Sequence, residues 1–248
     1  MSVKFTYLGG MNVLIEREDG FKIVCDPYIT GGANKVAKVS DLYDVDVILV
    51  THAAFDHFGD TIDICRNSNC IVCGGAEVLR KIRKEYDLPD ERWHGTTYGD
   101  RFVIDEITVS RTVFAQHGSI DNSEGIYTCW PPYGFVVQIE PGVTYYHTGD
   151  TYLYSDMKML RELYKPNVMC VGISGITTKY SCEMSPREAA QAVGWVGADV
   201  VIPTHYPPGS PDFDKFIKHV ESFSPDTKVL PEWNKPFIFT PSSVKLCE

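Results

Sequence analysis

The sequence lacks the long apolar runs and the targeting segments that would tie a protein to a membrane. Its 248 residues contain no apolar stretch of the roughly 18 residues that a membrane-spanning helix requires. The first residues lead directly into a strand pattern, without the apolar core and small-residue cleavage site of a secretory signal peptide. We therefore expect a soluble, cytoplasmic protein with no membrane partner.

Basic residues are also in short supply. The chain has 23 Lys and Arg against 33 Asp and Glu, which gives a formal net charge of −10. Because binding to nucleic-acid phosphates requires a basic surface, this balance argues against a nucleic-acid partner. It does not exclude a locally basic pocket.

The sequence gives little sign of disulfide bonds. It has eight cysteines. Because the chain is long and 44% hydrophobic, it can form a sizeable core without disulfide bonds. Cys70 and Cys73 form a C-x-x-C inside an apolar run, and no second pair follows at the spacing of a zinc ribbon. We interpret the cysteines as small buried hydrophobic residues.

No linker-like change of composition and no low-complexity segment divides the chain. The predicted order is first several strands and then alternating strands and helices, and this order occurs twice along the chain. This order predicts one domain over residues 1–248, built from two similar halves that each carry a mixed sheet with helices on its outer face.

Periodicity and turn residues place the individual elements. Asp60 suits the N-terminal turn of one helix, and Ser185 with Glu188 forms a capping box at the start of another. The predicted helices are 60–66, 76–86, 155–164, one beginning at 185, and 212–223. The predicted strands are 3–8, 13–16, 22–25, 45–50, 70–73, 101–104, 107–113, 134–140, 143–147, 168–171, 199–203, 228–230 and 237–239.

Histidines and acids gather where predicted strands end. The apolar run 45–50 leads into residues 51–60, which contain several of them. Four of the seven histidines lie in such short loops, namely His52, His57, His117 and His205. His147 lies inside a strand and His219 on a helix face, so we interpret both as structural. Imidazole nitrogens with a hard carboxylate oxygen are the donors that zinc prefers, so the pattern predicts a divalent-metal site.

Several short motifs follow one another over nearly the whole chain. They are Tyr7-Leu8-Gly9-Gly10, Asp26-Pro27, residues 51–60, Gln116-His117, residues 146–151, residues 184–190 and residues 202–206. Together they resemble the metallo-β-lactamase superfamily, and in particular its cytoplasmic metal-dependent hydrolases and ascorbate-phosphate lactonase-like enzymes. The resemblance implies an α/β fold, a four-layer αββα sandwich of two mixed β-sheets, which agrees with the two halves inferred from the element order.

The resemblance also implies a set of metal ligands. Members of the family bind two metal ions. One of the two sites is complete here and comprises Asp56, His57, His205 and Asp150, with Asp150 expected to bridge both ions. The other site keeps His52, His117 and Asp150.

Two family histidines are missing from this sequence. Ala54 stands where the first site expects a ligand, and Gly10 replaces the histidine of the opening turn. Losing one imidazole should weaken the first site by several kcal/mol, because structural zinc binding totals about 10–16 kcal/mol. We expect one or two Zn²⁺ ions (or Mn²⁺ or Fe²⁺), with the complete site filled first. Water, substrate, Asp121 or Glu124 are candidates to fill the gap.

The expected activity is hydrolysis of a small ester, lactone or cyclic amide by a metal-bound hydroxide. Asp56 would orient the attacking water and accept its proton, and Tyr206 would donate a hydrogen bond to the developing oxyanion. One alternative is a phosphodiesterase that acts on a small phosphodiester. Another is a non-catalytic metal- or ligand-binding protein whose site has decayed. The expected partner is a small-molecule substrate, and assembly into a homo-oligomer stays open.

Overall fold

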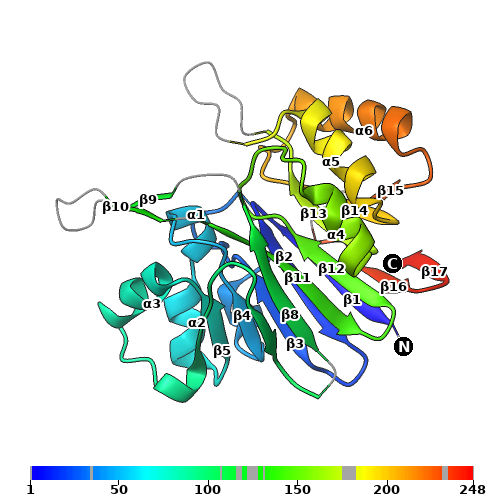
Figure 1. Ribbon diagram of the computed structural model, residues 1–248. Coiled ribbons are helices and arrows are strands. Elements are labelled where there is room, and N and C mark those ends of the chain that lie inside the picture. The colour runs from blue at the N-terminus through cyan, green and yellow to red at the C-terminus, as the bar shows by residue number, and fades with distance from the viewer. Residues whose placement is uncertain are drawn as a thin grey trace.

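The computed structural model describes residues 2–33, 36–106, 108–115, 119–121, 128–130, 132–174, 183–230 and 234–247. These residues form an eight-stranded sheet, a seven-stranded sheet and a separate pair of short strands. Helices lie outside the two large sheets, as Figure 1 shows.

The first large sheet contains most of the N-terminal half and the end of the chain. Its strands are β1 (Val3–Gly9), β2 (Asn12–Arg17), β3 (Lys22–Cys25), β4 (Val47–Leu49), β5 (Ile71–Gly74), β6 (Trp93–Gly95), β16 (Phe237–Thr240) and β17 (Ser243–Leu246). They are ordered β17-β16-β1-β2-β3-β4-β5-β6. Pairing is antiparallel from β17 to β3 and parallel from β3 to β6, so the sheet is mixed.

The second large sheet repeats this plan. Its strands are β7 (Arg101–Val103), β8 (Val109–Phe114), β11 (Tyr133–Glu140), β12 (Val143–His147), β13 (Val168–Gly172), β14 (Val200–Thr204) and β15 (Lys228–Val229). The order is β15-β14-β13-β12-β11-β8-β7, parallel from β15 to β12 and antiparallel beyond. The separate pair is β9 (Ser119–Asp121) with β10 (Thr128–Trp130).

Helices cover the outer face of each sheet. The first sheet is covered by α1 (Phe55–Phe58), α2 (Thr61–Asn67) and α3 (Ala76–Arg83), and the second by α4 (Met157–Tyr164), α5 (Pro186–Val196) and α6 (Pro211–Phe223). Short 3₁₀ turns occupy η1 (Val39–Leu42) and η2 (Asp90–Arg92). In the part of the chain that the structure describes, no helix is long and apolar enough to cross a membrane.

The inner faces of the two sheets meet in a shared apolar core. Phe5 lies at its centre, where its ring stacks on that of Phe237 at 5.2 Å between centroids and lies 5.6 Å from that of Tyr145. Helix, sheet, sheet and helix therefore form four layers. The αββα sandwich predicted from the sequence is confirmed.

Local sequence signals explain how some elements begin. The Ser185 hydroxyl accepts a hydrogen bond from the Glu188 amide, and the Glu188 carboxylate accepts one from the Ser185 amide, so the predicted capping box of α5 is confirmed. Asp60 does occupy the N-cap position of α2, but its carboxylate makes no cap bond there. It accepts instead from the amides of Ile29 and Thr30, at 2.6 and 3.0 Å, and so fixes the loop after β3.

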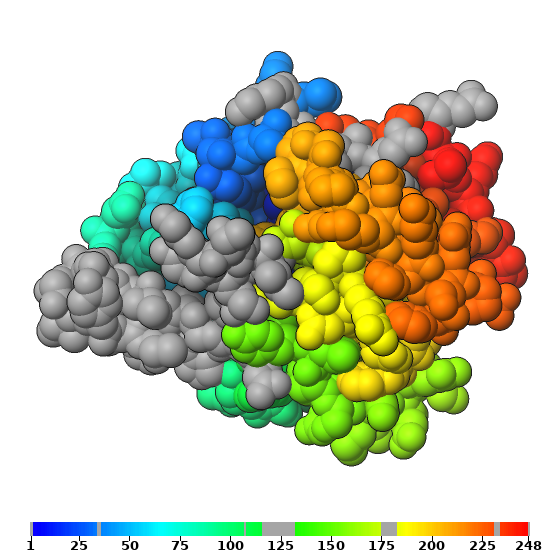
Figure 2. All heavy atoms as spheres, turned by 90° about the horizontal axis from the view of Figure 1, so that it is seen from above, coloured from blue at the N-terminus to red at the C-terminus, as the bar shows by residue number. Residues whose placement is uncertain are grey.

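Strand register brings the ends of both sheets to one edge. The parallel pairs Cys25–Leu49 and Gly172–Thr204 place the loops after β3 and β4 together, and likewise the loops after β13 and β14. The Tyr133 amide joins the two halves at this edge by donating to the Thr51 carbonyl at 3.0 Å. Seen from above, the N-terminal half, coloured blue to teal, and the C-terminal half, coloured yellow to orange, meet across the face in Figure 2.

The shared core makes the fold sensitive to truncation of Phe5, whose side chain is fully buried. Phe5→Ala should lower the free energy of unfolding by about 3–5 kcal/mol, because it removes apolar contacts and leaves a cavity between the sheets. Urea unfolding followed by circular dichroism measures the change. Leu163→Ala is the control: this α4 side chain is 60% exposed, and its loss should matter by about 0.5 kcal/mol or less. Equal effects of the two changes would contradict the assignment of the core.

Candidate metal centre

Five of the six predicted metal ligands lie together at the edge where the strands end. His52 follows β4, Asp56 and His57 are on α1, Asp150 follows β12, and His205 follows β14. The two halves of the chain therefore each contribute ligands. The sixth predicted ligand, His117, lies outside the described residues, as do the side chains of Asp121 and Glu124.

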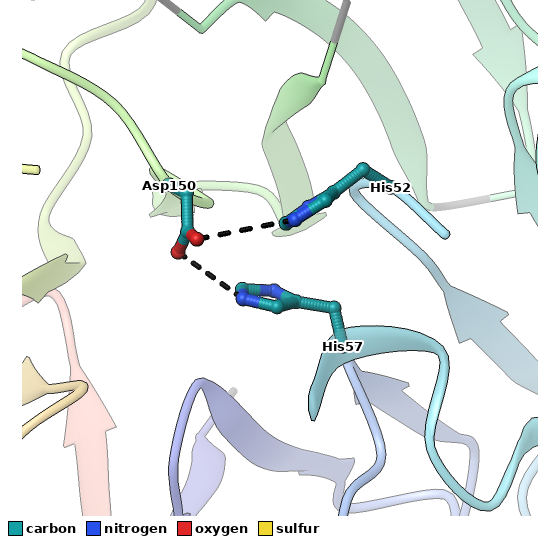
Figure 3. A group of neighbouring side chains, drawn as sticks. All are labelled: His52, His57 and Asp150. Atoms are coloured by element: carbon teal, nitrogen blue, oxygen red, sulfur yellow. Dashed lines mark ion pairs between the residues drawn. The ribbon is translucent and has the colours of Figure 1, made fainter. Parts of the chain in front are cut away.

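Asp150 faces two neighbouring imidazoles that come from the other half of the chain. Its Oδ1 is 3.1 Å from His57 Nε2, and its Oδ2 is 3.9 Å from His52 Nε2. Figure 3 marks both contacts with dashed lines. The His52 and His57 rings lie 4.1 Å apart between centroids. Nitrogen and oxygen donors from all three residues lie within 4.8 Å of one another, a spacing that a single cation can span.

A second group of donors shares His57. His205 Nε2 lies 3.3 Å from Asp56 Oδ2, and ligand atoms of Asp56, His57 and His205 fall within 4.8 Å of one another. Asp56 and His205 have side chains that are 26% and 23% exposed, whereas Asp150 is 9% exposed and His57 is buried completely. Among the described residues, the centre is therefore open to solvent on the side of Asp56 and His205.

Two residues at the centre, His205 and Gly149, have backbone φ angles in the left-handed region. His205 has a φ of 55°, in the left-handed region that is uncommon for a residue with a side chain. Its amide donates to the Gly10 carbonyl at 2.9 Å, which fixes this turn. Gly149, next to Asp150, has a φ of 58°, and a Cβ there would lie 2.7 Å from the Tyr133 carbonyl oxygen, so only glycine fits. Ala54 occupies the N-cap position of α1, the helix that carries Asp56 and His57, and its side chain makes no cap hydrogen bond.

A buried carboxylate, Asp26, stands behind the ligands. Its Oδ1 accepts from the Thr51 amide at 2.8 Å, and its Oδ2 accepts from the Thr51 hydroxyl at 2.8 Å. The same Oδ2 lies 2.8 Å from His57 Nδ1 and 3.1 Å from His147 Nε2. Because Asp26 engages Nδ1, the His57 ring is turned so that Nε2 faces Asp150.

Sequence reasoning assigned no role to Asp26 and interpreted His147 as structural. His147 is fully buried, bonds Asp26 through Nε2, and meets the Tyr145 hydroxyl at 2.8 Å through Nδ1. It therefore belongs to the support of the site as well as to the strand. The signal for Asp26 was present, because it follows a predicted strand as His52 does. Glu183, which also went unnoticed, lies 2.7 Å from His205 Nδ1.

The electrostatics of the cluster prepare it for a cation. Burial, and then the charge of neighbouring His57, lower the pKa of His52 to about 3, so this imidazole is neutral as a metal ligand must be. Burial opposes ionisation of Asp150, but the charge of His57 and then of His205 outweighs it and lowers the pKa of Asp150 well below its usual value. The carboxylate at the middle of the site is therefore ionised.

Burial disfavours protonation of His57 and His205, yet nearby carboxylates raise the pKa of both well above the ordinary value. Asp150 is the largest of these influences for each ring. Within the described residues, His57 Nε2 and Asp150 Oδ1 are buried and make no hydrogen bond of acceptable geometry. A divalent cation between them would satisfy both atoms and replace the proton, so the residues present fit a metal ion.

Tyr206 was predicted to donate a hydrogen bond to an oxyanion. In the structure its ring packs against two other aromatic residues. Its centroid lies 6.4 Å from that of Tyr7 and stacks on that of Phe213 at 5.5 Å. These contacts anchor the residue directly after His205. The hydrogen-bonding role remains a prediction.

Two mixed sheets between helical layers, with His and Asp donors at the strand ends, define a metallo-β-lactamase-type α/β sandwich. Residues 22–206 match the family model described as "Beta-lactamase superfamily domain". The chain therefore belongs to this family, and the resemblance seen in its motifs is confirmed at that level. The ascorbate-phosphate lactonase-like branch is not distinguished by the match.

Relatives and solved structures agree with this assignment. A UPF0173 metal-dependent hydrolase of Pyrococcus horikoshii is 38% identical over 222 residues, covering 88% of this chain and 92% of the relative. One from Methanopyrus kandleri is 33% identical over 232 residues, covering 92% and 96%. The structure of Igni18, a novel metallo hydrolase from Ignicoccus hospitalis, is similar with a TM-score of 0.79 and 26% identity, covering 97% of this chain and 99% of that one.

The support network makes a testable prediction about alkaline stability. Burial by itself would lower the pKa of His147, but neighbouring Cys170 and the hydrogen bond to Asp26 raise it to about 9. An unfolded histidine titrates near 6.5, so the stability that this proton contributes is complete below about pH 6.5 and is lost as pH rises through about 9.

Metal-stripped protein should therefore lose stability between these pH values, as measured by thermal unfolding in a pH series. The loss should be smaller in His147→Asn, which has no ring to titrate. His219→Asn, on α6, serves as the control and should keep the profile of the wild type. Identical profiles for wild type and His147→Asn would show that His147 is not charged in the folded protein.

Proposed function

We propose that this chain, a metal-dependent hydrolase of the metallo-β-lactamase superfamily, cleaves a small ester, lactone or cyclic amide at the centre formed by Asp56, His57, Asp150 and His205. The observation that carries the proposal is the convergence of these four side chains from both halves of the fold. Asp56 and His205 lie on its solvent-accessible side, where a substrate can reach them.

Zinc suits the mixture of imidazole and carboxylate donors, and Mn²⁺ or Fe²⁺ are the alternatives. When bound, such an ion lowers the pKa of a coordinated water and polarises a carbonyl oxygen. His57 and His205 would hold it through Nε2, with Asp56 and Asp150 supplying oxygen.

The protein residues then have separate tasks. Asp56 faces the accessible side and its pKa is lowered: burial opposes this, but the His205 hydrogen bond and the His57 charge outweigh it. An ionised carboxylate at this position can orient a water molecule and accept its proton. Asp150 fixes the orientation of the neighbouring His52 and His57 imidazoles, which both face its carboxylate. Tyr206 would donate to the oxyanion if its hydroxyl turns toward the carbonyl.

The charge around the centre favours an acyl substrate over a phosphodiester. Four carboxylates lie in or directly behind the site, those of Asp26, Asp56, Asp150 and Glu183. This negative field repels an anionic phosphodiester, whereas a neutral ester, lactone or amide approaches without that penalty. The protonated His147 beside Asp26 and a single bound cation would together offset part of this negative charge.

We also propose that the complete site binds the principal ion. His52 and Asp150 belong to the other site, but Ala54 offers it no donor atom. With fewer protein ligands that site binds more weakly.

Metal analysis of purified protein tests this ordering. The wild type should hold about one equivalent of zinc after dialysis, because only one site keeps its full donor set. Ala54→His should raise the content toward about two equivalents by restoring an imidazole. Ala53→His places the same side chain one position away and is the control. A wild type that already holds two equivalents would show that another group replaces the missing ligand.

Activity separates the proposed substrate classes. Wild-type protein should hydrolyse p-nitrophenyl esters or simple lactones faster than bis-p-nitrophenyl phosphate, and a chelator should abolish the reaction. Asp56→Asn should lower kcat by about 10²–10⁴-fold, because the neutral amide is a weaker metal ligand than the carboxylate and cannot accept the proton. Asp87→Asn, at an exposed acid, is the matched control and should retain full activity. Faster turnover of the phosphodiester would reverse the assignment of substrate class.

A further inference from the structure

We propose that Glu183 is a positioning residue for His205, which it locks in the orientation that presents Nε2 to the metal. This inference rests on the metal centre proposed above. Glu183 belongs to none of the motif positions that supply ligands, and it lies just before α5, in sequence far from its partner.

The geometry of the pair is that of a carboxylate holding the far side of a metal-binding imidazole. Glu183 Oε2 lies 2.7 Å from His205 Nδ1, and the Glu183 side chain is only 3% exposed. The other ring nitrogen, Nε2, points the opposite way and lies 3.3 Å from Asp56 Oδ2. A carboxylate this close to Nδ1 favours a proton on that nitrogen, and the Nε2 lone pair is then available to a cation.

The fold provides a fitted niche for this carboxylate. At Gly172, the last residue of β13, a Cβ would lie 3.2 Å from Glu183 Oε2 and 3.5 Å from His205 Cβ. The absence of a side chain there leaves room for the Glu183 carboxylate beside the imidazole. On the other side, Glu183 is followed by buried Met184 and by the capping box of α5, so its backbone is anchored on a rigid helix.

Glu183 does for His205 what Asp26 does for His57. In both cases a buried carboxylate engages Nδ1 and leaves Nε2 facing the centre. His52 differs, because its Nδ1 meets the neutral hydroxyl of Thr51 at 3.0 Å. A carboxylate behind the ring makes the imidazole a stronger ligand. Both imidazoles of the complete site thus have a carboxylate at Nδ1.

Direct ligation by Glu183 is the competing role. Ligand atoms of Asp150, Glu183 and His205 lie within 4.8 Å of one another, so the distance alone permits it. The closest approach of Glu183 to His205 is at Nδ1, on the side of the ring away from Asp56. The positioning role follows from this orientation, and the experiment below distinguishes the two roles.

The test measures metal affinity and ligand geometry, neither of which depends on turnover. Zinc dissociation constants are obtained by competition with a chromophoric chelator, and visible spectra are recorded after loading with Co²⁺. The variants are Glu183→Gln, Glu183→Ala and Gly172→Ala, with Glu221→Gln as a control at an exposed acid on α6. Thermal unfolding of each metal-free variant establishes that it is folded.

Removing a carboxylate that supports a metal-binding histidine costs about 10–100-fold in affinity. We expect Glu183→Ala near the upper end of this range and Glu183→Gln near the lower, since the amide oxygen still accepts from Nδ1. Gly172→Ala keeps the charge but displaces the carboxylate, and it should weaken binding in the same direction. The Co²⁺ bands should shift while their intensity, which reports coordination number, stays the same. The control should match the wild type.

Affinities for all three variants within about twofold of the wild type would overturn the role of Glu183 and leave the proposed function intact. A change in Co²⁺ band intensity in Glu183→Gln would show instead that Glu183 is a ligand, and would also overturn the positioning role. If the wild type itself binds neither zinc nor Co²⁺, the proposed function fails and this inference fails with it.

Discussion

The hydrogen bonds to one buried carboxylate determine how the centre is built. Asp26, at the end of β3, binds the amide and hydroxyl of Thr51 and the rings of His57 and His147. Its partners come from both sheets, so the group that aims a ligand also ties the two halves together. Burying an ion is costly unless its oxygens are fully satisfied, and this network satisfies them. The φ of 45° at Asp26 is part of the same constraint.

Much of the architecture could be predicted from the sequence because the decisive signals are local. The apolar run before His52 and the capping box at Ser185 each report on a few neighbouring residues, and both predictions hold in the structure. Short pieces such as α1 and β6 were missed, since four or three residues carry no periodicity. Asp60 shows the limit of local reasoning, because its carboxylate serves a loop thirty residues away in sequence.

The clustering of the candidate ligands could be predicted because histidines and acids at strand ends stand out, and strand ends converge on one edge. The supporting residues could not, because their roles depend on tertiary contacts. Glu183 meets His205 only after β13 and β14 have paired, and His147 reads as an ordinary strand residue until Asp26 is placed beside it. The gap at Ala54 was visible in the sequence, whereas the carboxylates behind His57 and His205 were found only in the structure.

The division of the donors between the two halves has a consequence for the stability of the metal-free protein. His52, Asp56 and His57 are carried by one sheet and its helices, while Asp150 and His205 are carried by the other. A cation bound among them would link the two halves of the fold. Its binding free energy would then add to the free energy of unfolding of the whole protein. Metal binding would therefore add to the stability that the shared core and the Asp26 network already give to the contact between the two halves.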